Sequence, residues 1–151
     1  MLYAFCAPPF YTKFVTAPTG VPFFMQRNPK FWPYFQHAIG AIDGTQIICA
    51  PSLAMRSACR NHKGFVSQNC LFCCSFKLQF TYSYTGWEGS ATDARVFHAA
   101  RLSGTLEIPD GKYYLADAGF GMCPQLLTPY PGVRYHLAEW GCANLRYGPC
   151  N

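Results

Sequence analysis

Acidic residues are so scarce in this chain that the few that follow apolar stretches restrict how it can fold. Only seven occur among 151 residues, and Asp43 and Asp117 each come directly after an apolar run. A carboxylate taken out of water costs free energy unless it is paired or binds a cation, so both are candidate metal ligands, with Asp93 a third. No single helix or loop can carry all three. They can meet only in a fold that brings strand ends together.

Composition predicts one domain with a large apolar core. Half of the residues are hydrophobic and 13% are charged, against about 25% charged in typical domains. The formal net charge of +5 has the sign expected for a protein with a polyanionic partner. No apolar run is as long as a membrane span, so we expect no membrane partner.

The nine cysteines are better explained as reduced thiols than as disulfides. Their number is odd, Cys73 and Cys74 are adjacent, and no signal-peptide pattern precedes them. We therefore expect an intracellular protein in which Cys70, Cys73 and Cys74 act as small hydrophobes on a strand, with Cys70 and Cys74 on one face. A zinc site built from Cys70, Cys73, His62 and Cys123 is the alternative.

Hydrophobic periodicity predicts a mixed sheet with one helix. A strand is expected over residues 38–42, interrupted by a turn or bulge at Asp43 and resumed over residues 45–49. Two runs at residues 68–76 and 78–85 are expected to form an antiparallel hairpin. The other expected elements are a basic loop at residues 51–67, a helix at residues 93–102 with Thr92 as its N-cap, and a strand at residues 112–116.

This order of elements predicts where the acids meet. If the strand before Asp117 returns through a helical crossover, it lies parallel to the strand of Asp43, and the two acids become neighbours at adjacent strand ends. The domain is expected to span residues 38–140, after a lead-in segment at residues 1–37 that is rich in proline and aromatic residues. Residues 141–151 form a divergent tail.

Two facing carboxylates suit Mg²⁺ or Mn²⁺, which prefer oxygen ligands. A pair of such ions can activate a water molecule or a 3′-hydroxyl and stabilise the leaving oxygen in phosphodiester cleavage. The alternative is purely structural. An Asp-Gly pair often marks a turn, and Asp93 beside Thr92 favours a helix N-terminus without binding anything.

Five motifs, in this order, resemble Harbinger-type transposases and the nucleases derived from them. They lie at residues 28–31 (NPKF), 40–45 (GAIDGT), 60–65 (RNHKGF), 86–90 (GWEGS) and 112–119 (KYYLADAG). The resemblance implies an α/β, RNase H-like DDE endonuclease domain that uses Mg²⁺ or Mn²⁺ to cut DNA at transposon ends. Asp43 and Asp117 match catalytic, metal-binding acids, and Asp93 matches a further acid that is either a metal ligand or a helix cap.

The resemblance also implies a nuclear or cytoplasmic location and a separate DNA-binding protein as partner. Relatives carry a third catalytic acid, a glutamate on a helix after the position of Asp117, and Glu139 does not match it. Gln46 stands where relatives commonly have histidine. We therefore expect a C-terminally truncated metal-dependent DNA endonuclease domain, impaired or inactive alone.

The alternative function is a non-enzymatic remnant that binds DNA or protein. Its phosphate contacts, like those of a nuclease, would come from basic side chains. The candidates are Arg56, Arg60, Lys63, Arg95 and Arg134. Ordinary solvation of a basic surface explains the same residues equally well.

Overall fold

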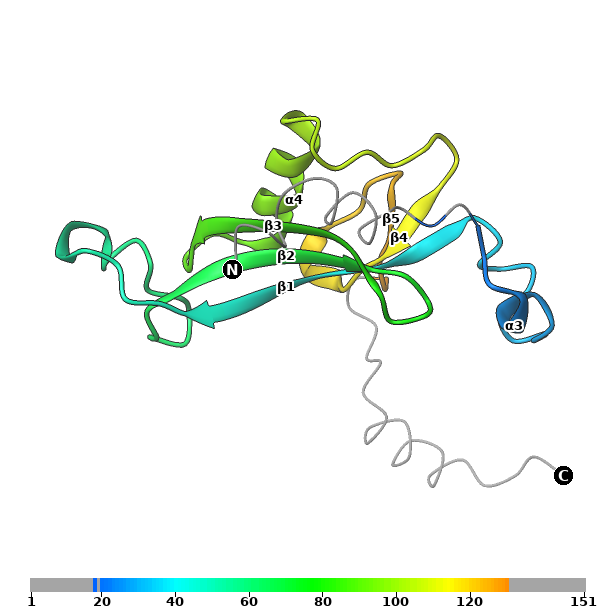
Figure 1. Cartoon of the computed structure of the whole chain (residues 1–151), viewed down its shortest axis with the longest axis horizontal. Coiled ribbons are helices and arrows are strands. Elements are labelled where there is room, and N and C mark those ends of the chain that lie inside the picture. Colours follow the sequence, from blue (N-terminus) through cyan, green and yellow to red (C-terminus); the bar gives the residue numbers. More distant parts are fainter. Residues whose placement is uncertain (1–17, 19, 131–151) are drawn as a thin grey trace, which may run out of the picture.

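The computed structural model describes residue 18 and residues 20–130, which form a five-stranded mixed sheet with one long helix against it (Figure 1). The strands are β1 (Ala38–Ile48), β2 (Ser67–Cys74), β3 (Phe80–Glu88), β4 (Tyr113–Leu115) and β5 (Leu126–Leu127). Their order in the sheet is β3-β2-β1-β4-β5. β1, β2 and β3 are antiparallel neighbours, whereas β4 runs parallel to β1 and β5 parallel to β4. This α/β architecture is consistent with the expected RNase H-like fold.

The helices are short except for one. α3 (Phe23–Gln26), η1 (Leu53–Met55) and η2 (Ala118–Phe120) are single turns, and α4 (Asp93–Leu102) has ten residues. The Thr92 hydroxyl accepts from the Arg95 amide, so the predicted helix and its N-cap are confirmed. α4 connects β3 to β4, which makes the parallel β1–β4 pair possible. No helix among the described residues is long and apolar enough to cross a bilayer.

The predicted interruption of the first strand at Asp43 is wrong. β1 is continuous through Asp43 and Gly44, because β2 pairs with every residue from Ala41 to Ile48. The irregularity lies earlier, between Ala38 and Gly40, on the side that pairs with β4. Asp43 is therefore in the middle of a strand and not at its end.

The core lies between the sheet and α4. Ile39, Leu71 and Val96 are at most 1% exposed, and Cys73 belongs to the same cluster. Strand alternation places Cys70 and Cys74 on the face opposite Cys73. All three thiols are free, and burial raises the pKa of Cys73 to about 12.

Three predicted segments lie wholly or partly outside the described residues. In the lead-in at residues 1–37, residues 1–17 and 19 are not described, and neither are the domain beyond residue 130 and the tail at 141–151. The boundary between residues 37 and 38 coincides with the start of β1. The division into lead-in, domain and tail stays a prediction.

Candidate metal and nucleic-acid site

Asp43 and Asp117 are brought together by the parallel pairing of β1 and β4. Ala41 pairs with Leu115. Because the strands are parallel, Asp43 and Asp117, each two residues later, follow on the same side of that pair. β4 ends at Leu115, so Asp117 lies just past a strand end while Asp43 lies within β1. Both side chains are exposed.

The two carboxylates are each anchored by a nearby backbone amide. The Gly44 N–H donates to Asp43 Oδ1 at 2.8 Å, and the Gly119 N–H donates to Asp117 Oδ1 at 2.9 Å. The second bond caps η2, which turns the chain away from the sheet directly after Asp117. Both acids are therefore held in place by their own local backbone.

Burial raises the pKa of Asp43, and the negative charges of Asp117 and Asp93 raise it further, against the lowering effect of the Gly44 amide. Like charges close together disfavour ionisation of one another. Asp43 therefore lies within electrostatic reach of both other acids.

Asp93 approaches the site from the first turn of α4. The Asn69 Nδ2 donates to Asp93 Oδ1 at 2.6 Å and to the Ala91 carbonyl at 2.9 Å. On its other side the carboxylate lies against Gly44, so close that a Cβ atom there would overlap it. The helix N-cap is Thr92, so Asp93 is left to interact with Asn69 and Gly44.

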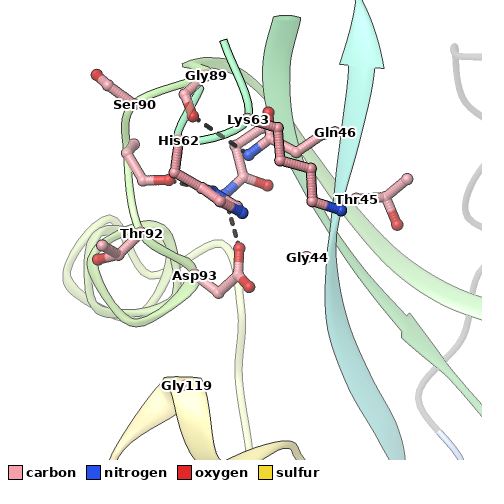
Figure 2. A pocket seen from close by; sticks show the side chains of 12 residues that line it. Gly44, Thr45, Gln46, His62, Lys63, Gly89, Ser90, Thr92, Asp93 and Gly119 are labelled. Atoms are coloured by element: carbon pink, nitrogen blue, oxygen red, sulfur yellow. Dashed lines mark hydrogen bonds between the residues drawn. The ribbon is translucent and has the colours of Figure 1, made fainter. Parts of the chain in front are cut away.

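A hollow of about 580 Å³ adjoins these acids. Figure 2 shows Asp93 on one side of it and His62 and Lys63 on the other. The lining residues are Gly44, Thr45, Gln46, His62, Lys63, Asn69, Gly89, Ser90, Ala91, Thr92, Asp93 and Gly119. The hollow therefore carries both an acidic and a basic wall.

The basic wall is held by a chain of buried and partly buried hydrogen bonds. Asn61 donates from Nδ2 to Ser67 Oγ at 2.9 Å and accepts at Oδ1 from the amides of Lys63 and Phe65. The Ser67 hydroxyl donates to Gln46 Oε1 at 2.6 Å. Because Asn61 and Ser67 are buried, the loop that presents His62 and Lys63 is fixed to β1 and β2.

The predicted DNA-binding residues are dispersed. Lys63 lines the hollow, whereas Arg60 donates to the Gly64 carbonyl at 2.7 Å and so closes its own loop. The Arg95 guanidinium stacks on Trp87, 5.7 Å from the ring centroid, and Arg56 is exposed after η1. Arg134 lies outside the described residues.

Within residues 20–130, no group of three or more histidine, cysteine, aspartate or glutamate side chains is close enough to hold a metal ion. The structure thus shows Asp43, Asp93 and Asp117 as interacting acids without showing a three-ligand site. It likewise shows no zinc site from Cys70, Cys73, His62 and Cys123 in this part of the chain.

Sequence reasoning missed Asn69, Asn61 and Gly44. Asn69 had a readable signal, because it occupies the same strand face as Leu71 and Cys73, where an amide is out of place unless it has polar partners. Asn61 and Gly44 had no comparable signal. Their partners lie on other elements and became visible only in the structure.

Comparison with known proteins gives two findings. A family model described as DDE superfamily endonuclease matches residues 42–146, a range that contains Asp43, Asp93 and Asp117. Putative nuclease HARBI1 of Xenopus laevis is 36% identical over 110 residues, which are 67% of this chain and 31% of that relative. The chain therefore spans about a third of the relative's length. No solved structure matches it.

Proposed function

This chain belongs to the DDE superfamily endonucleases, and from that premise we propose that it is a transposase-derived, divalent-metal-dependent nuclease domain with DNA as its substrate. Asp43 and Asp117 are the proposed catalytic acids. The observation that carries the proposal is their placement side by side on parallel strands, with the charge of Asp117 acting on Asp43.

The donor set fits Mg²⁺ or Mn²⁺. Two exposed carboxylates supply hard oxygen ligands, and each uses one oxygen for a backbone amide, so the second oxygen of each is available to a cation. When bound, the cation would activate the attacking oxygen and stabilise the leaving one. The Gly44 and Gly119 amides hold the two carboxylates, and the Gly44 amide offsets only part of the repulsion that raises the pKa of Asp43. With two protein ligands, we expect the cation to keep several waters and to bind weakly, at about millimolar concentration.

The basic wall of the hollow is evidence for the proposal that a DNA strand binds next to the acids. Lys63 is exposed on a loop whose backbone Asn61 holds in place, so the loop presents this side chain at the edge of the hollow. Cations of this kind attract and orient the phosphate backbone without reading sequence. Arg56, Arg60 and Arg95 would contact phosphates from separate parts of the surface. A nuclear location and a separate DNA-binding partner complete the proposal.

A second candidate is a DNA- or protein-binding remnant without catalysis. It is favoured by one observation, namely that no three-ligand group exists among the described residues. Such a protein would bind DNA equally well with and without divalent metal.

Thermal denaturation with Mn²⁺, Mg²⁺ and Ca²⁺ tests the proposal, alongside nicking of supercoiled plasmid. Mn²⁺ should raise the melting temperature of the wild-type chain because it binds only the folded arrangement. Asp43→Asn and Asp117→Asn should each abolish that shift, whereas Asp110→Asn, in an exposed turn, should keep it. Identical shifts in the wild type and in Asp43→Asn would contradict the metal site. DNA binding that ignores metal, with no nicking at any Mn²⁺ concentration, would favour the second candidate.

A further inference from the structure

Asn69 is a fully buried amide whose two donors are both used on acceptors near the proposed site. It is 1% exposed, and its Nδ2 donates to the Ala91 carbonyl and to Asp93 Oδ1. Its own Oδ1 is buried and has no partner among the described residues. Turning the amide over would set Oδ1 against two other acceptors, so the observed orientation is the only one that the surroundings accept.

Apolar packing does not account for this arrangement. Leu71 and Cys73 fill the neighbouring positions of the same strand face with apolar side chains. An amide in that row leaves a buried carbonyl oxygen unsatisfied, which native structures rarely tolerate. What the amide provides is a short, charge-assisted hydrogen bond to the Asp93 carboxylate.

Gly44 completes the restraint from the opposite side. The Asp93 carboxylate packs directly against its backbone, where any Cβ atom would overlap both carboxylate oxygens. Gly44 is also the residue whose amide anchors Asp43. Because Gly44 has no side chain, only backbone separates the two carboxylates, and the negative charge of Asp93 acts on Asp43.

We propose that Asn69 and Gly44 are positioning residues that hold the Asp93 carboxylate beside Asp43, where its negative charge strengthens cation binding by the metal-binding acids. This inference rests on the proposed function, because it assigns Asn69 and Gly44 to the same metal-binding group. Partners that orient a ligand in this way typically change metal affinity by about 10- to 100-fold when they are removed. Neither residue touches the reacting atoms, so neither is catalytic.

The test is a double-mutant cycle on Mn²⁺ affinity, measured by calorimetry and by electron paramagnetic resonance of free Mn²⁺. Asn69→Leu and Asp93→Asn should each weaken Mn²⁺ binding about 10-fold or more. The double variant should be no weaker than Asp93→Asn alone, since Asn69 acts only through Asp93. Thr81→Val, which removes another buried polar group from the next strand, should leave Mn²⁺ affinity unchanged.

Gly44→Ala keeps the test decisive if Asn69→Leu does not fold. It retains the Asn69 amide and displaces only the carboxylate, so it should weaken Mn²⁺ binding as much as Asp93→Asn. Wild-type affinity in Asn69→Leu or in Gly44→Ala, or additive losses in the double variant, would overturn the inference. If Asp43→Asn abolishes Mn²⁺ binding and these variants do not, only the inference is wrong. If Asp43→Asn binds Mn²⁺ like the wild type, the proposed function itself is wrong.

Discussion

The two halves of β1 differ although they belong to one uninterrupted strand. From Ala38 to Ile42 all residues but one are buried, whereas from Asp43 to Ile48 all residues except Gly44 are exposed. β4 pairs with the first half, from Ala38 to Ala41, but it ends at Leu115 and leaves the second half with β2 as its only described strand neighbour. The candidate site therefore forms where the sheet loses a strand, and Asp43 is the first exposed residue of β1 past the end of β4.

The halves are also stabilised by different interactions. The buried half packs in the apolar cluster with α4, through residues such as Ile39 and Ile42. The exposed half is fixed by side-chain hydrogen bonds, in which Gln46 joins Ser67 and the Gly89 carbonyl. Apolar packing sets the stability of the fold, and the polar network sets the geometry of the hollow. Changes in the two halves should thus be separable by experiment.

The largest expected effect comes from truncating the buried half. Ile39→Ala removes a side chain that is 1% exposed, and such changes cost about 2–5 kcal/mol of unfolding free energy. The matched variant Ile47→Ala, where the side chain is 41% exposed, should cost less than about 1 kcal/mol. Urea denaturation measures both. Equal losses would show that the exposed half is covered in solution and that the contrast is wrong.

A smaller effect is expected from loosening the polar network. Asn61→Ala removes a buried donor and the acceptor of two loop amides, so it should lower the free energy of unfolding by about 1–3 kcal/mol. Because the loop of Lys63 is then free to move, binding of a short duplex at low salt should weaken as well. Fluorescence anisotropy measures this binding. Lys63→Ala should weaken DNA binding without destabilising the fold. Wild-type binding by both variants would show that this loop does not contact DNA.

The smallest effect concerns the charge of Asp43 itself. Since burial and neighbouring carboxylates raise the pKa of Asp43 in the folded state, its contribution to stability is present below the unfolded pKa and is lost as pH rises through the folded value. In metal-free buffer, Asp43→Asn should therefore gain stability relative to the wild type as pH rises above about 4, by less than about 1 kcal/mol because the group is largely exposed. The gain is measured by comparing the melting temperatures of Asp43→Asn and the wild type from pH 3 to pH 7. A gain that is largest at pH 3 and falls as pH rises would show instead that the folded protein favours the ionised Asp43 carboxylate.

Local patterns predicted the regular elements well. The helix at residues 93–102 matches α4, because its apolar positions and its cap are all encoded within one segment. The hairpin of β2 and β3 and the parallel return of β4 also match. β5 was missed, since two residues carry no period. The error at Asp43 arose because Asp-Gly is a turn signal in isolation, while pairing to β2 on every residue overrides it.

By itself the sequence determined that acids were few, that two of them followed apolar strands, and that a helical crossover would make those strands parallel. These are properties of neighbours along the chain, where period, caps and turn residues act locally. Only the tertiary structure decided that β4 ends before the second half of β1, that Asn69 hydrogen-bonds to Asp93, and that Gly44 leaves room for the Asp93 carboxylate. Each of these depends on contacts between residues distant in sequence, whose distances and burial are set by packing.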